Sequence, residues 1–264
     1  MVLAMAMLEV RDVTLTFRGL AALLNVGFSV EQGQITSLIG PNGAGKTSML
    51  NCISGRYHPD EGKIALNGRD LLPMAAHDRV MAGLSRTFQN IALFKGLSVL
   101  DNLMVGRHIR LNYGLLSSLF YWGKARRSED LHRKRIEEII DFLGLSPHRH
   151  QVAGKLPYGV QKRVELGRAL AGEPELLLLD EPMAGMNLEE TEDMARYILD
   201  INEEWGITVL LVEHDMGVVM DISDQVVVLD FGQVLATGTP AQVQADPNVV
   251  AAYLGSDNAS FVGR

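Results

Sequence analysis

The hydrophobic and polar positions near the start of the chain follow the period of β-strands. Residues 13–17, VTLTF, alternate apolar and polar side chains, as a half-buried strand does. The stretch LLNVGFSVEQGQ predicts a second strand, and PDEGKIALNGRDL predicts a third that ends in an Asn67-Gly68 turn. We therefore expect the chain to begin with a small antiparallel β region.

Longer apolar runs that alternate with helical patterns follow. ITSLIG is a short apolar run before a glycine-rich loop and a helix, and ELLLLDEP and ITVLLVEHD are similar runs further on. Uniformly apolar strands separated by helices are typical of a parallel sheet covered on both faces. QVVVLDFGQVLATG predicts a hairpin. The fold class indicated is α/β with a mostly parallel core sheet.

A helical region interrupts this alternation. Residues from about 91 to 155 read as helices, and RKRIEEIIDFLGL has an apolar stripe at helical spacing. Its members are Ile136, Ile139, Ile140 and Leu143. We expect a helical subdomain inserted into the α/β core.

The whole chain, 1–264, is then expected to form one domain with internal divisions. The α/β core with its β region comprises 1–90 and 156–264, and the helical subdomain comprises 91–155. Thr239-Pro240 and Asp246-Pro247 are typical helix starts, which predicts a C-terminal helical tail over 239–264.

Composition and charge exclude several classes of protein. The net charge is −8, which argues against a chain that wraps nucleic acid, because phosphate backbones require clustered cations. Cys52 is the single cysteine, so there is neither a disulfide framework nor a cysteine metal site. No run approaches the roughly 18 to 20 apolar residues that span a bilayer. A role at a membrane would need a membrane-embedded partner.

A phosphate-binding loop is the strongest chemical signal. GPNGAGKTS matches the pattern G-x-x-x-x-G-K-[ST], in which glycines let backbone amides surround phosphates. In this pattern the lysine reaches the β and γ phosphates and the threonine hydroxyl binds Mg²⁺. The predicted binding residues are Gly40, Pro41, Asn42, Gly43, Ala44, Gly45, Lys46, Thr47 and Ser48.

A carboxylate pair follows one of the apolar strands. The run LLLLDE ends in Asp180 and Glu181. A bound triphosphate needs a ligand for its metal and a group that positions water. Asp180 is predicted to reach the Mg²⁺ shell, and Glu181 is predicted to polarise the attacking water.

A helix start near Leu156 predicts a second anion site. LPYGVQKRVELGRALAG opens as a Pro-Gly turn and continues at helical spacing, and the first amides of a helix attract anions. Pro157 stands where a capping serine is expected. The residues by themselves leave open whether this turn holds a phosphate, and whose.

Taken in this order, the motifs resemble the nucleotide-binding subunit of an ATP-binding cassette (ABC) transporter. The resemblance implies the P-loop NTPase cassette fold and the cofactors ATP and Mg²⁺. It implies that Lys46, Glu181 and His214 are catalytic, with His214 near the γ-phosphate. The matching segments are Phe17 as the adenine-stacking aromatic, GPNGAGKT as Walker A, Gln89 as the Q-loop glutamine that also contacts the metal, LPYGVQ as the signature, LLLLDE with Asp180 as Walker B, MAGMN as the D-loop, and His214 in VEHD.

The same resemblance implies that two cassette chains dock head to tail. Each nucleotide then lies between the Walker motifs of one chain and the signature turn of the other. Pro157 removes a hydroxyl and an N–H from the usual signature, which leaves either a weaker working cradle or a degenerate half-site. The signature residues expected to contact the partner's nucleotide are Leu156, Pro157, Tyr158, Gly159 and Gln161.

Within the family, the chain is most similar to the ATP-binding subunits of branched-chain amino acid importers. TFRGLAALLNVGFSV, LLVEHDMGVVM and GTPAQVQADPNVVAAYLG carry this likeness. It implies integral membrane permease subunits as partners, a second cassette chain that is either a relative or a copy, and a peripheral position at the cytoplasmic face of the inner membrane. The segment HIRLNYGLLSSLFYWGKARR suits either a small core with a solvated rim or contact with permease or lipid.

Other functions remain open at this point. A lipid or polysaccharide exporter ATPase shares every motif. A DNA-maintenance or translation ATPase would need a long coiled coil or two cassettes in one chain, and a P-loop small-molecule kinase would leave the signature and His214 without a role. A regulatory subunit that binds ATP without hydrolysing it conflicts with the presence of Lys46, Asp180, Glu181 and His214.

Overall fold

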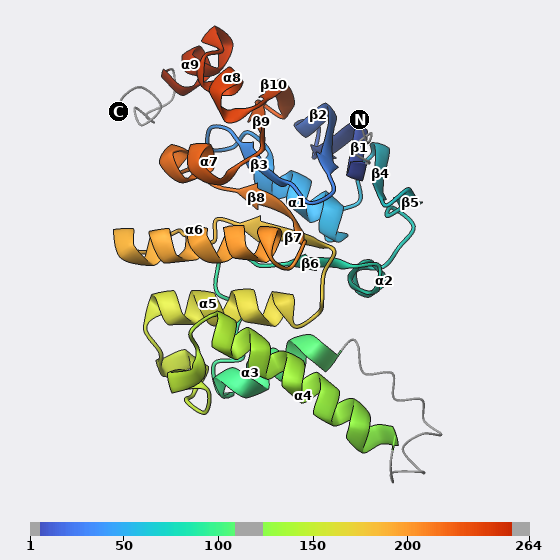
Figure 1. Ribbon diagram of the computed structural model, residues 1–264. Coiled ribbons are helices and arrows are strands. Elements are labelled where there is room, and N and C mark those ends of the chain that lie inside the picture. Colours follow the sequence, from blue (N-terminus) through green and yellow to red (C-terminus); the bar gives the residue numbers. More distant parts are fainter. Residues whose placement is uncertain (1–5, 109–123, 255–264) are drawn as a thin grey trace, which may run out of the picture.

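A four-stranded antiparallel sheet forms one edge of the molecule. The computed structural model describes residues 6–108 and 124–254 (Figure 1). The strand order is β2-β1-β4-β5. Asn67 and Gly68 form the turn between β4 and β5 with positive φ angles of 50° and 74°, as the Asn-Gly pair predicts. The strands are β1 (Ala6–Phe17), β2 (Leu20–Glu31), β4 (Glu61–Leu66) and β5 (Arg69–Asp70).

A six-stranded sheet forms the centre of the fold. Its order is β10-β9-β3-β8-β7-β6. All neighbours pair in parallel except β10, which forms the expected hairpin with β9. The short edge strand β6 has no counterpart in the apolar pattern, because three residues show no period. The strands are β3 (Ile35–Ile39), β6 (Leu84–Arg86), β7 (Leu176–Asp180), β8 (Thr208–Val212), β9 (Gln225–Asp230) and β10 (Gln233–Gly238).

The central strands are apolar throughout because they contribute side chains to two cores. Every residue of β3, β7 and β8 is buried. Leu178 and Leu210 belong to the core that includes helix α1 (Lys46–Ser54), whereas Leu179 and Leu211 belong to the core that includes α6 (Leu188–Glu203). Adjacent strand residues thus face opposite layers, as the pleat requires.

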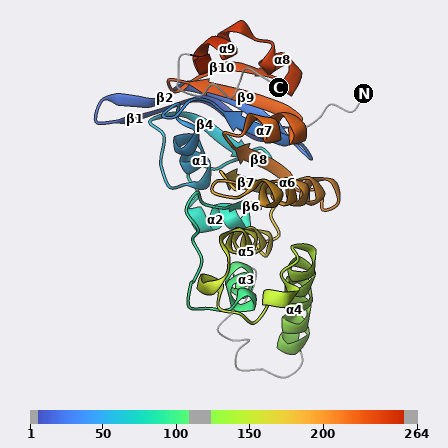
Figure 2. The same cartoon turned by 90° about the vertical axis from the view of Figure 1, so that its left-hand side faces the viewer.

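Helices pack together on the side of the sheet away from the β region. Helices α3 and α4 lie at one end of the molecule in both views, and α5 lies between them and α6 (Figures 1 and 2). The predicted stripe, from Ile136 on α4 to Leu143 directly after it, is fully buried. The boundaries 91 and 155 stay a prediction, and the segment 109–123 lies outside the described residues. The elements here are α3 (Val99–Arg107), α4 (Lys124–Phe142), the 3-10 turns Ser146–His148 and Ala153–Lys155, and α5 (Tyr158–Leu170), whereas α2 (Ala76–Met81) packs against α1 on the side of the β region.

Short helices close the opposite end (Figure 2). Thr239 caps α8 (Pro240–Gln244) in a reciprocal arrangement with Gln242, and α9 (Pro247–Leu254) follows Asp246, so both predicted helix starts are confirmed. Together with α7 (Met216–Ile222) they cover β9 and the edge strand β10 through a core that contains Val243, Val249 and Tyr253.

The carboxyl ends of three adjacent strands carry the motifs. β3 leads into the glycine-rich loop, β7 ends at Asp180, and β8 precedes His214. Because β3 pairs with β8 and β8 pairs with β7 in parallel, the carboxyl ends of these three strands lie side by side. In open parallel sheets, ligands bind at the carboxyl ends of the strands.

Candidate active site

The loop after β3 surrounds a concave space with backbone. Helix α1 begins at Lys46, so the unpaired amides of its first turn lie at the cavity wall. An arrangement of glycine-rich backbone and a helix N-terminus binds phosphate. The cavity measures about 270 Å³ and is lined by Ala22, Asn42, Gly43, Ala44, Gly45, Lys46, Thr47, Ser48, Gln89 and Glu181.

Two glycines of this loop have no room for a side chain. Gly40 has a φ of 148°, and a Cβ there would collide with the carbonyl oxygen of Leu229. Gly45 has a φ of 104°, and a Cβ there would lie 2.7 Å from the oxygen of Ala22. The loop is therefore pressed against β9 and β2 at a distance that only glycine permits.

The Lys46 ammonium is folded onto its own loop. Its Nζ donates hydrogen bonds to the carbonyl oxygens of Gly40, at 2.6 Å, and Pro41, at 3.0 Å. Burial lowers the pKa of Lys46, and the carboxylates of Glu181 and Asp180 oppose that shift. The cation is thus held at the cavity with partners that a phosphate can replace.

Asp180 presents one satisfied and one unsatisfied carboxylate oxygen. Its Oδ2 accepts a hydrogen bond from Arg86 Nη2 at 2.8 Å, while its buried Oδ1 has no partner among the described residues. Thr47 supplies a hydroxyl on the first turn of α1, at the cavity. An unpaired carboxylate oxygen and a hydroxyl are the hard oxygen donors that Mg²⁺ prefers, so these residues fit that ion.

Arg86 is a site residue that the sequence analysis did not identify. Its guanidinium also donates to Asn51 Oδ1 and Ser54 Oγ on α1, each at 2.8 Å. It therefore connects the edge strand β6, helix α1 and the carboxylate that ends β7. The sequence signal for Arg86 was weak. A single arginine in the stretch SRTF matches no motif, and its partner Asp180 lies 94 residues further along the chain.

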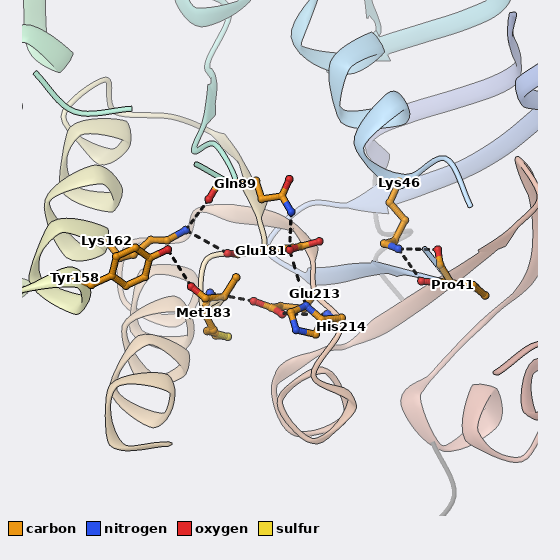
Figure 3. A network of polar contacts seen from close by, with 11 residues as sticks. Pro41, Lys46, Gln89, Tyr158, Lys162, Glu181, Met183, Glu213 and His214 are labelled. Atoms are coloured by element: carbon orange, nitrogen blue, oxygen red, sulfur yellow. Dashed lines mark hydrogen bonds and ion pairs between the residues drawn. The ribbon is translucent and has the colours of Figure 1, made fainter. Parts of the chain in front are cut away.

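Glu181, Gln89 and His214 converge beside the cavity (Figure 3). Gln89 Nε2 donates to Glu181 Oε2 at 3.0 Å, and His214 Nδ1 lies 4.0 Å from the same oxygen. Glu181 has a φ of 48°, an unusual value for a residue with a side chain that often marks a functional position. Three residues that are far apart in sequence thus meet around one carboxylate.

Glu213 supports this group and was also missed. It is buried, and its carboxylate accepts the N–H groups of Met183 and His214, each at 3.0 Å. Burial raises the pKa of Glu213. The carboxylate ties the loop after β7 to the loop after β8. An acidic residue that directly ends the apolar run TVLLV was the available sequence signal.

The signature turn lies outside the cavity lining of the described chain. Pro157 is the N-cap residue of α5 and makes no side-chain cap, as its replacement of serine predicts. Gln161 Nε2 donates to the carbonyl oxygen of Leu156 at 2.8 Å, which closes the turn on itself. Leu156, Pro157, Tyr158, Gly159 and Gln161 are all absent from the lining of this cavity.

The signature turn does contact the loop that follows Glu181. The Tyr158 hydroxyl donates to the Ala184 carbonyl at 3.1 Å. A Cβ on Gly159 would lie 2.6 Å from Cδ of Glu190, whose carboxylate forms a capping box with Asn187 at the start of α6. The asparagine of MAGMN therefore serves as a helix cap.

Phe17 is positioned at the end of β1 with 44% of its surface exposed. Its ring packs edge to face against Tyr57 with centroids 5.2 Å apart. The ring is therefore not part of the buried core. Stacking of Phe17 on an adenine stays a prediction.

Within residues 6–108 and 124–254, no helix is both long and apolar enough to cross a lipid bilayer.

Two family models match the chain. The ABC transporter model matches residues 23–184, and the model for the branched-chain amino acid ATP-binding cassette transporter matches residues 233–259. The first begins within β2 and ends in the loop after β7. The second covers β10 and the C-terminal helices.

Proteins of known name are similar over nearly the whole chain. The high-affinity branched-chain amino acid transport ATP-binding protein BraF of Pseudomonas aeruginosa is 43% identical over 94% of this chain and 97% of its own length. The corresponding protein LivG of Escherichia coli is 40% identical over 94% of this chain and 98% of its own length.

Solved structures share the fold. The ADP conformation of MJ1267, an ATP-binding cassette of an ABC transporter, is 34% identical with a TM-score of 0.83, and the match covers 96% of this chain and all of that one. A dimeric post-hydrolysis state of the cassette MJ0796 bound to ADP and Pi is 25% identical with a TM-score of 0.75, covering 89% and 99%. The expected cassette fold is confirmed.

Proposed function

The chain belongs to the ABC transporter family of ATPases, and from that premise we propose that it powers the import of branched-chain amino acids by hydrolysing ATP. The observation that carries the ATPase part is the meeting of Lys46, Gln89 and Glu181 around a cavity of phosphate-binding backbone. The names of the relatives and the family model that matches 233–259 support branched-chain amino acids as the solute.

The nucleotide binds through the glycine-rich loop. Backbone amides between Asn42 and Ser48 hold the phosphates, and Lys46 exchanges the carbonyls of Gly40 and Pro41 for phosphate oxygens. Phe17 stacks against the adenine, for which an exposed aromatic ring is suited. The exchange keeps the buried ammonium paired throughout.

Thr47 and Asp180 would hold Mg²⁺, with Gln89 as a further ligand. When bound, this ion neutralises charge on the β and γ phosphates. The unpaired Oδ1 of Asp180 supports this assignment, because a buried carboxylate oxygen without a partner is costly unless a cation or donor occupies it.

Glu181 orients the attacking water. Its carboxylate accepts a hydrogen bond from that water and polarises the O–H bond. Gln89, which hydrogen-bonds the Glu181 carboxylate, keeps it at the cavity edge. His214 lies on the adjacent loop with its Nδ1 4.0 Å from Glu181 Oε2, and would contact the γ-phosphate of a bound nucleotide. These groups position the nucleophile and stabilise developing charge, which is most of what phosphoryl transfer requires from a protein.

A second cassette chain completes each site. Because the signature residues do not line the cavity of their own chain, their helix start suits the nucleotide of a partner, either a copy or a relative. Pro157 weakens this cradle without abolishing it, since the dipole and the amides of the first turn of α5 remain. Closure of the pair is then driven by the difference in ATP affinity between closed and open states.

The chain acts as a peripheral subunit at the cytoplasmic face of the inner membrane, docked on permease subunits that carry the solute. Nothing in this role requires the amino acid to touch this chain. An exporter ATPase is the alternative, and the relatives named for branched-chain amino acid transport favour import.

The ATPase proposal is tested with the purified chain in Mg-ATP. Wild type should release phosphate, and Glu181→Gln should bind ATP without turnover. Light scattering of Glu181→Gln over a range of concentrations should show an ATP-dependent dimer. A variant that binds ATP but stays monomeric would indicate that a different cassette chain or the permease is required for closure.

The solute is tested by reconstituting the chain with the membrane subunits that copurify with it. ATP-dependent accumulation of leucine, isoleucine or valine in proteoliposomes is the expected result. ATP-dependent loss of labelled lipid from one leaflet, without amino acid uptake, would contradict import and favour the exporter.

A further inference from the structure

One face of α5 carries charged side chains that form hydrogen bonds with the loop containing Gln89. We name residues 87–92, which follow β6, the glutamine loop. Lys162, Glu165 and Arg168 lie three residues apart on α5, so they share a face. Each makes a hydrogen bond with backbone of the glutamine loop. The start of this same helix is the signature turn.

Lys162 contacts the backbone of both residues whose side chains meet at the site (Figure 3). Its Nζ donates to the carbonyl oxygen of Gln89 at 3.2 Å and to that of Glu181 at 3.4 Å. The Gln89 amide in turn donates to the Glu181 carboxylate. The three residues therefore close a ring in which Lys162 sets the distance between the two backbones.

Burial of this lysine is costly, so its position requires compensation. Lys162 is only 3% exposed, and burial lowers its pKa, which the charges of Glu165, Glu213, Glu181 and Asp180 oppose. A buried ammonium often contributes little net stability compared with an apolar residue of similar size. Its use here is better explained by the two carbonyls that it brings together.

The neighbours of Lys162 on α5 hold the far end of the loop. The Ala92 N–H donates to Glu165 Oε1 at 3.1 Å, and Arg168 Nη1 donates to the Ala92 carbonyl. Burial raises the pKa of Glu165, and the nearby backbone of Ala92 and Phe88 opposes that shift. The glutamine loop is thus fixed to α5 at both ends, and Gln89 lies between them.

We propose that Lys162 is a positioning residue that holds Gln89 and Glu181 in register with the helix that begins at the signature turn. This inference rests on the proposed function. The Tyr158 ring lies 5.9 Å from Lys162 Nζ, and its hydroxyl bonds to Ala184 beyond Glu181. A displacement of α5 when its start meets a partner's nucleotide is therefore passed to the water-positioning carboxylate.

Hydrogen exchange of the full-length, nucleotide-free chain tests this role independently of turnover. Lys162→Met keeps the side-chain length and removes the ammonium. Amides in 87–92 and 181–184 should exchange about tenfold faster than in wild type, while peptides from β1 and β2 stay unchanged, because only a local anchor is lost. Lys63→Met, an exposed lysine on β4, is the matched control and should alter neither region.

Catalysis provides the second readout. Lys162→Met should lower kcat about tenfold or more with ATP affinity within about twofold, since a misplaced catalytic group affects the chemical step more than binding. Failure of the wild type to hydrolyse ATP when assembled with the subunits that copurify with it would overturn the proposed function, whereas the exchange experiment would still decide the role of Lys162.

Glu165 keeps the test decisive if Lys162→Met does not fold. Glu165→Ala should loosen 87–92, and Glu165→Gln should preserve it, because the amide oxygen of glutamine still accepts the Ala92 N–H. The proposal is overturned if exchange in 87–92 is unchanged in the Lys162→Met chain, or in Glu165→Ala where the former is unfolded. Equal acceleration in β1 and β2 would also overturn it, because that indicates general destabilisation.

Discussion

Arg86 and Asp180 form an ion pair across the two strands at the edge of the central sheet. The Nη2 to Oδ2 distance is 2.8 Å, and the side chains are 6% and 2% exposed. The pair orients the carboxylate so that its second oxygen stays unpaired. A structural ion pair thus sets the geometry of a proposed metal ligand.

Removing this arginine should affect both stability and metal use. Arg86→Met leaves Asp180 buried without its cation, so the free energy of unfolding should fall by about 3 kcal/mol. The Mg²⁺ concentration that gives half-maximal ATP hydrolysis should also rise, because the carboxylate is no longer held. Urea unfolding and a Mg²⁺ titration of phosphate release measure the two effects.

Arg56→Met is the control, since Arg56 is an exposed arginine just beyond α1. It should change the unfolding free energy by less than about 0.5 kcal/mol. A similar small loss in Arg86→Met would mean that the buried pair is not what orients Asp180.

A methyl group at Gly40 should disrupt the phosphate loop. Gly40→Ala brings a Cβ against the Leu229 carbonyl at a φ that side chains avoid, so we expect a stability loss of about 2 kcal/mol or more and weaker ATP binding. Gly96→Ala meets open space and should be close to neutral. Calorimetric ATP titration with thermal unfolding distinguishes the two, and normal ATP binding by Gly40→Ala would contradict the close contact.

Restoring a serine in the signature should strengthen the cradle. Pro157→Ser returns a hydroxyl and an N–H at the N-cap of α5, which should raise thermal stability by about 1 kcal/mol through capping. ATP turnover of the assembled complex should rise about two- to tenfold, as expected for one added hydrogen bond. Pro147→Ser is the control at an exposed proline. A rise in stability with unchanged turnover would show that the proline is neutral for catalysis.

Cys52 should make stability depend on pH in the alkaline range. Burial raises the pKa of this thiol from 9.0 to about 11, so the folded chain keeps a proton that the unfolded chain loses. The folded state binds more protons between these values, and stability must fall as pH rises from 9 toward 11. No such effect is expected below pH 8.

Cys52→Ala should flatten this part of the profile. The wild type should lose about 1 kcal/mol more than the variant between pH 8 and pH 10, measured by urea unfolding at each pH. Parallel profiles for the two chains would contradict a thiol held neutral by burial. The constant offset from the smaller side chain does not affect the comparison.

The parts of the fold that depend on local signals were predictable from sequence. The burial of Ile136 through Leu143 and the hairpin after Gln225 follow from periodicity, and the phosphate loop follows from a pattern within nine residues. Asp180 and Glu181 were found because they end an apolar run. In each case the information lies within a short stretch.

The buried polar contacts were not predictable in this way. Arg86 acts through a residue 94 positions away, and Lys162 faces a loop 73 positions away. Helical periodicity identifies apolar stripes, so a buried lysine on α5 reads as solvent-facing. Strand β6, which carries Arg86, is too short to show a period. Tertiary packing, and not local sequence, gives these residues their partners.

The close approach of Gly159 to Glu190 couples the effects of mutations in two motifs of this protein. Any side chain at 159 enters the space of the carboxylate that caps α6 with Asn187, so it displaces the D-loop cap before it affects a nucleotide. The flexible end of Glu190 can move aside, and the cost is then the loss of its hydrogen bond from the Asn187 N–H. A substitution at 159 is therefore expected to show mild epistasis with a substitution at 190 within one chain.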